Sequence, residues 1–292
     1  MTARKTFHSF DGTRLSYSLE GEGPRDFALC DGIGCAGYVW RHLAPALKTQ
    51  GRVIHLHMRG HGESDPPANP KNVGITDLAD DWGRLLAETN AQDVVLIGHS
   101  MGVQVALETW HRHRERIAGL VLMCGSFQNP VATFRNGKGL AVALPVLQRL
   151  TRFGGRPLRR VWKEALNLPI AYHVARMAEI HPDLLSRRDF DPYLADLGAI
   201  DPALFTRMLA GAASHSASGW LEQVDVPVLV IGASEDHFTP VRLSEEMAAR
   251  IPDARLVLIE EGTHSAPIEH PMRVQLEIER FIAALPTYAA AS

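Results

Sequence analysis

Residues 94–110 read VVLIGHSMGVQVALETW, and they predict a buried strand that turns sharply into a helix. The run from 94 to 98 is continuously apolar, as in a strand that is buried on both faces. The residues from 100 to 113 have helical spacing. A very tight turn between two such elements leaves little room for side chains, and the glycines at 98 and 102 provide that room on either side of Ser100. The pattern G-x-S-x-G therefore predicts that the Ser100 hydroxyl stands clear of the sheet.

Ser100 is the candidate nucleophile of the chain. A serine hydroxyl is weakly nucleophilic at neutral pH unless a base lies beside it and hydrogen-bond donors face the carbonyl group that it attacks. The helix that follows Ser100 favours developing negative charge at its N-terminus. The alternative is a chance glycine-serine helix cap, and the strand before the motif and the helix after it both argue against that alternative.

A base and an acid are expected further along the chain. The segment VLVIGASEDHFTP (228–240) offers two adjacent carboxylates, Glu235 and Asp236, just after a predicted strand. The segment EEGTHSAPIEHP (260–271) places His264 in a loop between the last predicted strand and the last predicted helix. Open α/β sheets build their sites at the carboxyl ends of the strands, where all of these residues fall. From position alone either carboxylate fits the acid, Asp236 also fits a simple turn, and His264 also fits a structural loop residue.

Strands and helices alternate along most of the chain, which predicts a mostly parallel central sheet flanked by helices. A hairpin is expected over 6–19. Strands are expected at 26–32, 52–58, 94–98, 117–125, 226–233 and 254–260, and helices at 77–88, 100–113, 243–250 and 271–285. Between 126 and 220 helix-like pieces replace the strands. We therefore expect an α/β core formed by residues 1–125 and 221–292, with residues 126–220 inserted as a helical cap, or lid, over the carboxyl edge of the sheet.

Four segments together resemble the α/β-hydrolase superfamily, in its serine-nucleophile, esterase- and lipase-like branch with a helical cap. They are GHSMG (98–102), RGHGES (59–64), GASEDHFTP (232–240) and EGTHSAPIEHP (261–271). The resemblance covers nearly the whole chain, and it implies the α/β-hydrolase fold. It also implies that Ser100 is the nucleophile, Asp236 the orienting acid and His264 the base of a catalytic triad. Neither a metal nor an organic cofactor is needed for such chemistry.

The same resemblance implies an oxyanion hole made by the backbone N–H groups of Ile33 and Met101. Ile33 belongs to the segment Asp31-Gly32-Ile33-Gly34, which stands where the family usually has a His-Gly loop. Two residues depart from the family pattern. Asp31 stands where histidine is common, and His57 stands where aspartate is common. Neither departure removes a member of the triad, but the first bears on the geometry of the oxyanion loop.

Composition narrows the function classes and the partners. The net charge is −3, so no basic excess points to nucleic acid as a partner. No run of about 18 apolar residues predicts a membrane span, and the N-terminus lacks an apolar core of signal-peptide length. Three cysteines cannot all pair, and none lies in a CxxC motif, so we expect a reduced, cytoplasmic setting. The pattern fits a monomer or a homodimer.

The expected cap carries two features that bear on the substrate. One is a basic run made of Arg149, Arg152, Arg156, Arg159, Arg160 and Lys163. A solvated helix face explains it, and an anionic or carrier-bound acyl substrate is the alternative. The other is a set of candidate lining residues for an acyl pocket, namely Trp162, Tyr172, His173, Phe205, Met208 and His215.

These observations favour a serine hydrolase that cleaves a carboxylic ester of a small to medium apolar acyl group through an acyl-enzyme. The same triad also serves C–C bond hydrolysis, lactone or thioester cleavage, acyl transfer and perhydrolysis, because a fold does not fix a function. A serine nucleophile argues against the branches that use a carboxylate there, which are the dehalogenases and epoxide hydrolases. A non-enzymatic scaffold is disfavoured because all three triad residues are present.

Overall fold

The structure is a computed structural model that describes residues 4–132, 139–176, 180–181 and 183–286. An eight-stranded sheet runs through this part of the chain in the order β1-β2-β4-β3-β5-β6-β7-β8. The pairs β1–β2 and β2–β4 are antiparallel, and the other five pairs are parallel. The strands are β1 (Lys5–His8), β2 (Arg14–Glu20), β3 (Asp26–Cys30), β4 (Arg52–Leu56), β5 (Val94–His99), β6 (Ile117–Met123), β7 (Val228–Ala233) and β8 (Ala254–Ile259).

Successive residues of the central strands pack into two separate apolar layers. In β5, Val94 and Leu96 belong to one buried cluster, whereas Val95 and Ile97 belong to the other. Side chains of a strand alternate between the two faces of a sheet, and here both faces are covered. This is why the strand reads as an unbroken apolar run rather than as an alternation of polar and apolar residues. The predicted α/β sheet is thus confirmed.

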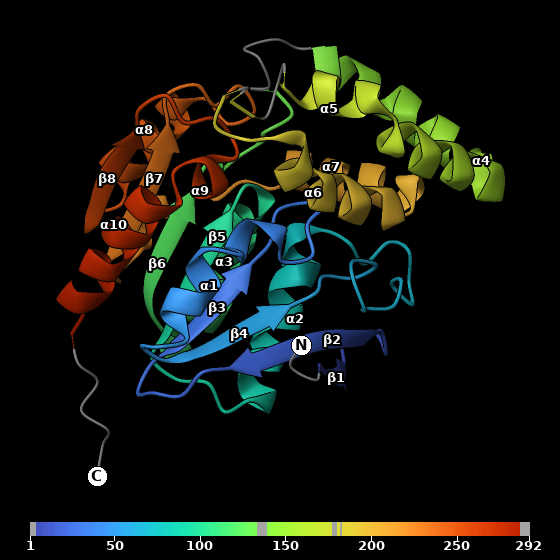
Figure 1. The fold of residues 1–292 in the computed structure, drawn as a ribbon. Helices are drawn as coiled ribbons and strands as arrows, with labels where there is room; N and C mark the ends of the chain where they lie inside the picture. The colour runs from blue at the N-terminus through green and yellow to red at the C-terminus, as the bar shows by residue number, and fades with distance from the viewer. Residues whose placement is uncertain (1–3, 133–138, 177–179, 182, 287–292) are drawn as a thin grey trace.

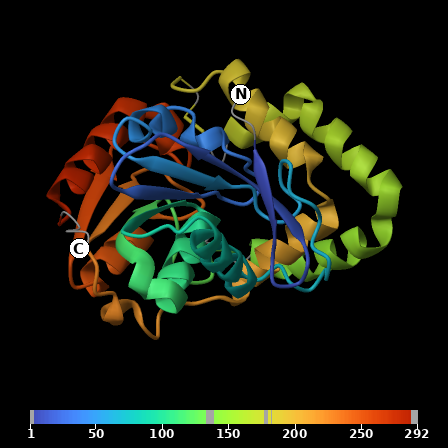
Figure 2. The same ribbon diagram turned by 90° about the horizontal axis from the view of Figure 1, so that it is seen from below.

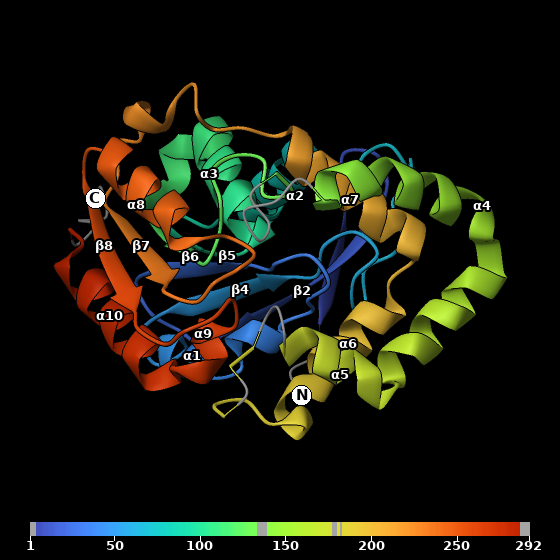
Figure 3. The same ribbon diagram turned by 90° about the horizontal axis from the view of Figure 1, so that it is seen from above.

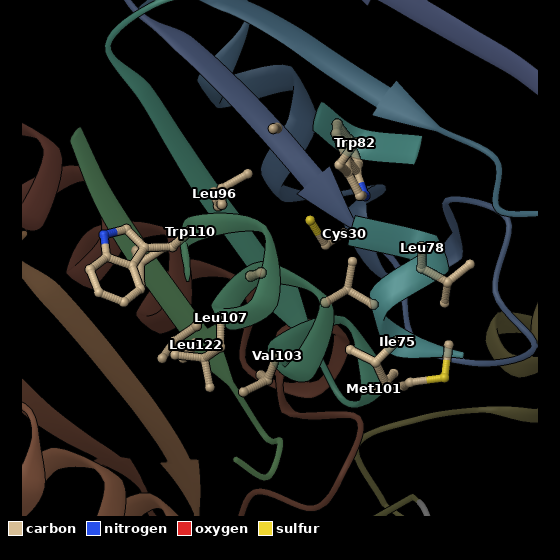
Figure 4. Close-up of a cluster of buried hydrophobic side chains, with 14 of the residues drawn as sticks. Cys30, Ile75, Leu78, Trp82, Leu96, Met101, Val103, Leu107, Trp110 and Leu122 are labelled. Atoms are coloured by element: carbon tan, nitrogen blue, oxygen red, sulfur yellow. The ribbon is translucent and has the colours of Figure 1, made fainter. Parts of the chain in front are cut away.

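Helices cover both faces of the sheet. Figures 2 and 3 show α2 (Ile75–Glu88), α3 (Met101–His113) and α8 (Val241–Arg250) on one face, and α1 (Leu43–Leu47) and α10 (Pro271–Ala284) on the other. Figure 4 shows how large side chains of α2 and α3 fill the first of these interfaces, among them Trp82, Leu107 and Trp110. This packing fixes α3, and therefore the turn that precedes it, against the end of β5.

Four helices lie beyond the carboxyl ends of the strands (Figures 1 and 3). They are α4 (Gly139–Asn167), α5 (Pro169–Arg176), α6 (Arg187–Ala199) and α7 (Pro202–Ser214), and they fall within the helical insertion predicted from sequence. α4 is kinked at Gly155, which has φ 50° and ψ −148°. Short helical turns complete the chain, namely η1 (Tyr38–Trp40), η2 (Arg114–Arg116), η4 (Leu221–Gln223) and α9 (Ala266–Glu269). No helix in the described part of the chain is long and apolar enough to cross a membrane.

Candidate active site

Ser100 occupies a strained turn between β5 and α3. Its backbone has φ 58° and ψ −123°, a conformation that L-residues rarely adopt. The turn is possible because two glycines flank the serine. A Cβ on Gly98 would overlap the carbonyl oxygen of Gly102, and a Cβ on Gly102 would overlap the carbonyl oxygen of Cys30. The glycines therefore allow backbone contacts that hold the Ser100 side chain at the carboxyl end of the sheet.

Three side chains from separate segments form a continuous hydrogen-bonded chain. His264 Nε2 lies 2.8 Å from Ser100 Oγ, and His264 Nδ1 lies 2.9 Å from Asp236 Oδ2. Asp236 follows β7, and His264 follows β8. A carboxylate oxygen only accepts, so the Nδ1 atom carries the proton in the neutral imidazole and Nε2 is left as the acceptor for the Ser100 hydroxyl. The arrangement suits proton transfer from a serine nucleophile to a base.

Asp236 is held as a carboxylate by several donors. The backbone N–H groups of Phe238 and Thr239 each donate to Oδ1 at 2.8 Å, and the Thr239 hydroxyl donates to Oδ2 at 2.7 Å. Burial alone raises the pKa of this carboxyl, but the nearby His264 and the hydrogen bonds outweigh burial, so the net pKa of Asp236 is lowered. The neighbouring Glu235 side chain is exposed. The structure thus brings Asp236, and not Glu235, onto the imidazole.

The loop that carries His264 is anchored at two points. His99 Nε2 lies 2.9 Å from the carbonyl oxygen of His264, which only accepts, so this ring nitrogen carries the proton. Burial lowers the pKa of His99 to about 4, with a further contribution from His264, and keeps the ring neutral. On the other side, the Thr263 N–H donates to Glu269 Oε2 at 2.9 Å, and the Thr263 hydroxyl donates to Oε1 at 2.8 Å. The sequence pattern alone assigns neither His99 nor Glu269 a part in the site.

Side chains from several elements hold the glycine-rich loop 32–37 and Asp31, the residue before it. Asp31, just before the loop, accepts from Trp40 Nε1 at 2.6 Å and lies 2.8 Å from His55 Nε2. Asp31 is therefore satisfied by groups of the core, although it stands where the family has histidine. The Gly34 N–H donates to His61 Nε2 at 3.2 Å, so the RGHGES segment reaches this loop. The Ala36 N–H donates to Asp196 Oδ2 of α6 at 3.2 Å.

A cavity of about 300 Å³ lies over Ser100 and is lined mainly by apolar side chains. Ser100, His264, Ile33 and Met101 all line it, so both expected oxyanion donors belong to residues that face the same space as the hydroxyl. α6 and α7 supply much of the opposite wall, through Phe190, Tyr193, Leu197, Phe205, Leu209 and Ala212. None of the described lining residues is Asp, Glu, Lys or Arg. The cavity fits an uncharged, largely apolar group.

Of the six residues expected in the acyl pocket, Phe205 alone is among the described lining residues. Trp162 packs behind Phe205, and its Nε1 donates to the carbonyl oxygen of Leu197 at 3.0 Å. Met208 is fully buried in the core on the α2–α3 face of the sheet, while the neighbouring residue Leu209 faces the cavity. The expectation that Trp162 and Met208 line the cavity is therefore wrong, because each helix is oriented so that these side chains point away from the cavity.

The other three residues of that set also lie elsewhere. The Tyr172 hydroxyl donates to the carbonyl oxygen of Leu185 at 2.8 Å, inside a separate apolar cluster. His173 is exposed. His215 stands behind the cavity wall, where its Nε2 lies 3.1 Å from Glu108 Oε2 and its Nδ1 lies 3.3 Å from Gln104 Nε2. Gln104 does line the cavity, one helical turn after Ser100, and that spacing is the signal by which it was identifiable from sequence.

The basic run lies on α4 and is exposed, at Arg149, Arg152, Arg156, Arg159, Arg160 and Lys163. Arg159 is paired with Asp201. None of these six side chains is among the described residues that line the cavity. The run is therefore a feature of the outer surface, away from the reacting atoms.

Comparisons with known proteins agree with this architecture. A family model described as alpha/beta hydrolase fold matches residues 27–271. The chain is 28% identical over 249 residues to a pimeloyl-acyl-carrier-protein methyl ester esterase of Neisseria meningitidis, which covers 83% of this chain and 72% of that protein. It is 24% identical over 287 residues to a putative 2-succinyl-6-hydroxy-2,4-cyclohexadiene-1-carboxylate synthase of Bacillus subtilis, which covers 94% and 97% of the two chains.

A solved structure shares the fold. An enol-lactonase from Burkholderia xenovorans superposes with a TM-score of 0.78 at 21% identity, over 96% of this chain and all of that chain. The family match spans most of the chain, and the sheet order, the strained serine turn and the hydrogen-bonded Ser-His-Asp chain agree with it. The chain is an enzyme that belongs to the alpha/beta hydrolase fold family.

Proposed function

We propose that the protein is a serine hydrolase that cleaves a carboxylic ester of a small to medium apolar acyl group. The observation that carries the proposal is the continuous chain of contacts from Ser100 Oγ to His264 to Asp236, which opens into an apolar cavity. The esterase named among the relatives supports the same class of bond.

In the first half of the reaction, the Ser100 Oγ attacks the acyl carbonyl carbon while His264 Nε2 takes the hydroxyl proton. Asp236 keeps the imidazole in the required tautomer and stabilises the imidazolium. The tetrahedral oxyanion is bound by the backbone N–H groups of Ile33 and Met101, and such donors contribute about 3–4 kcal/mol each in comparable enzymes. The C–O bond to the alcohol breaks, and the alcohol leaves with the proton from His264.

In the second half, His264 takes a proton from water as the water oxygen attacks the acyl carbonyl carbon. The bond between that carbon and Ser100 Oγ then breaks, His264 returns the proton to Ser100 Oγ, and the carboxylic acid is released. The apolar wall supplied by α6 and α7 surrounds the acyl chain and limits the access of other water molecules. The lack of a cationic side chain among the described lining residues argues against substrates that must bury a carboxylate, because an unpaired buried charge is costly.

A carrier-bound acyl ester is a second candidate substrate. The exposed basic run on α4 favours it, since an acidic carrier can contact the run while its neutral acyl ester enters the cavity. Reversing two of these charges, as in Arg152→Glu with Arg156→Glu, tests this candidate. A carrier-bound substrate is then expected to lose kcat/KM while a free ester is unaffected. An equal effect on both substrates contradicts it.

The proposed ester hydrolysis is tested by steady-state turnover of p-nitrophenyl esters from acetate to dodecanoate, with Ser100→Ala as the blank. The proposal predicts Ser100-dependent turnover with a chain-length optimum set by the cavity. Absence of turnover on the whole series, in a folded protein whose Ser100 still reacts with a phosphonate, contradicts ester hydrolysis. That result would favour C–C bond hydrolysis, lactone or thioester cleavage, acyl transfer or perhydrolysis by the same triad.

A further inference from the structure

The loop that carries the Ile33 oxyanion donor has little restraint within its own backbone beyond the turn in which the Cys35 N–H donates to the Gly32 carbonyl oxygen at 3.3 Å. It contains glycine at positions 32, 34 and 37, and Gly34 and Gly37 have φ of 85° and 100°. Glycine populates such conformations freely, so the sequence of this loop permits many backbone paths. An oxyanion donor works only when it is already aimed at the position of the developing charge. Contacts from outside the loop are therefore needed, together with this turn, to select the productive path.

Two side chains bind backbone N–H groups within the loop, and they come from different parts of the fold. His61 accepts from Gly34 and belongs to the turn after β4, next to the sheet. Asp196 accepts from Ala36 and belongs to α6, within the helical insertion. Ile33 directly precedes the first of these anchored residues. Its N–H is therefore positioned jointly by the sheet and by the inserted helix.

The rest of α6 packs on the same segment of the chain. A Cβ placed on Gly34 would come within 2.9 Å of Leu197 Cδ1, so the Leu197 side chain of α6 packs directly against Gly34. The Tyr38 ring lies edge-on to Phe190 at 6.2 Å between centroids. Arg41 Nη1 donates to the carbonyl oxygen of Asp189 at 2.9 Å. α6 thus contacts the loop and the turn after it at several points.

Asp196 is half-buried beneath these contacts, close to the buried Asp31 and to His55. Burial and the nearby Asp31 carboxylate both disfavour the charged form of Asp196 and raise its pKa. The charge-assisted hydrogen bond from Ala36 offsets part of this cost. The position is therefore occupied at a cost in stability, which is typical of a residue that serves the site.

We infer that Asp196 is a positioning residue, which makes the oxyanion hole complete only while α6 is docked on the loop. The inference rests on the proposed function, because it takes the Ile33 N–H as an oxyanion donor. Its consequence is that α6 both walls the cavity and sets the reactivity of Ser100. A substrate that keeps α6 in place is thus processed with an intact oxyanion hole, whereas displacement of α6 lowers the rate of acylation.

The test is the rate at which a small p-nitrophenyl phosphonate labels Ser100 in the full-length protein. Ser100 Oγ forms a bond to phosphorus, its proton passes to His264 Nε2, and p-nitrophenolate leaves. The phosphoryl oxygen occupies the oxyanion hole, so the rate reports on the hole without depending on the natural substrate. Asp196→Leu removes the acceptor at similar size, and Asp196→Asn keeps an acceptor oxygen. Asp191→Leu, on the exposed face of the same helix, is the matched control.

We expect Asp196→Leu to slow labelling about 10- to 100-fold, a share of the loss seen when an oxyanion donor is removed outright. The labelling rate of Asp196→Asn is expected to stay within several-fold of the wild-type rate, and the labelling rate of Asp191→Leu is expected to equal the wild-type rate. If the Asp196→Leu protein does not fold, Asp196→Ala is measured in its place. The inference is overturned if a folded Asp196→Leu or Asp196→Ala protein labels at the wild-type rate. Normal labelling of wild type without turnover of any ester instead contradicts the proposed function alone.

Discussion

The backbone N–H of Gly34 donates a hydrogen bond to His61 Nε2 at 3.2 Å, which ties the glycine-rich loop 32–37 to the turn after β4. His61 Nδ1 lies 3.0 Å from the carbonyl oxygen of Arg59, which only accepts, so Nδ1 carries the proton and Nε2 is free to accept. Burial lowers the pKa of His61, which keeps the ring in this neutral form. His61 is therefore held in the tautomer that accepts a hydrogen bond from the Gly34 N–H.

The first prediction is that His61→Ala lowers kcat by about tenfold to a hundredfold, because the loop loses one of its anchors. His61→Gln is expected to restore part of the rate, since its amide oxygen can accept from Gly34. Steady-state kinetics checks this, with His57→Ala as the control. His57 is also buried in this turn, but it accepts from the Glu63 N–H instead. A fall in kcat of the same size in both alanine variants would indicate general damage to the turn.

The second prediction concerns the glycine that follows Ser100 by two residues. Gly102→Ala places a methyl group on the carbonyl oxygens of Cys30 and Asp31, which cannot move without shifting β3. The free energy of unfolding should fall by about 1–3 kcal/mol, and turnover should fall with the displaced serine. Urea denaturation measures the first effect. Gly139→Ala is the matched control, because a Cβ there meets no atom within 4 Å. Equal stability of the two variants contradicts the close-packed turn.

The third prediction separates the two adjacent carboxylates. Asp236→Asn is expected to lower kcat on the order of 10⁴-fold, as in a comparable triad, because the amide favours the wrong histidine tautomer. Glu235→Gln is expected to leave kcat close to wild type, because that side chain is exposed. Rate measurements on one p-nitrophenyl ester decide between them. A large loss of kcat in Glu235→Gln, with little change in Asp236→Asn, would identify Glu235 as the acid of the triad.

The fourth prediction is a pH dependence of stability that comes from His99. Its pKa is about 4 in the folded protein and near 6.5 when unfolded, so the unfolded chain binds more protons between these values. Stability should therefore fall as the pH drops from about 6.5 to 4, by about 3 kcal/mol for a shift of this size. In His99→Gln, whose amide can still donate to the His264 carbonyl, this loss should shrink.

Thermal unfolding of wild type and His99→Gln across this pH range measures the difference. The same substitution at the exposed His173 serves as the control and should leave the acid limb of the wild-type curve unchanged. Parallel curves for wild type and His99→Gln would show that His99 does not contribute to the acid loss of stability.

The fold was predictable because each element carries a local signal that the packing reinforces. The apolar run of β5 and the helical spacing of α3 meet at two glycines that leave room for a very tight turn, and this pattern identified the position of Ser100. Asp236 and His264 follow strand-like runs, so the topology brings them to the same edge as the serine. Such signals need no knowledge of long-range contacts.

The cavity lining was not predictable in the same way. Whether Met208 or Leu209 faces the cavity depends on the rotation of α7, which is set by its contacts with α2 and α4. Both residues are apolar, so the sequence pattern does not distinguish a core position from a cavity wall. Asp196 also carried no local signal, because its partner, the Ala36 N–H, lies 160 residues away in the chain. Residues that act through distant partners require the assembled structure.

The central claim is that Ser100 forms an acyl-enzyme, and stopped-flow hydrolysis of the best p-nitrophenyl ester tests it most directly. We expect a burst of about one equivalent of p-nitrophenolate per active site, followed by slower turnover, with both phases absent in Ser100→Ala. A mass increase by one acyl group at Ser100 during the burst would identify the intermediate. Turnover in Ser100→Ala within about tenfold of wild type would show that Ser100 is not the nucleophile.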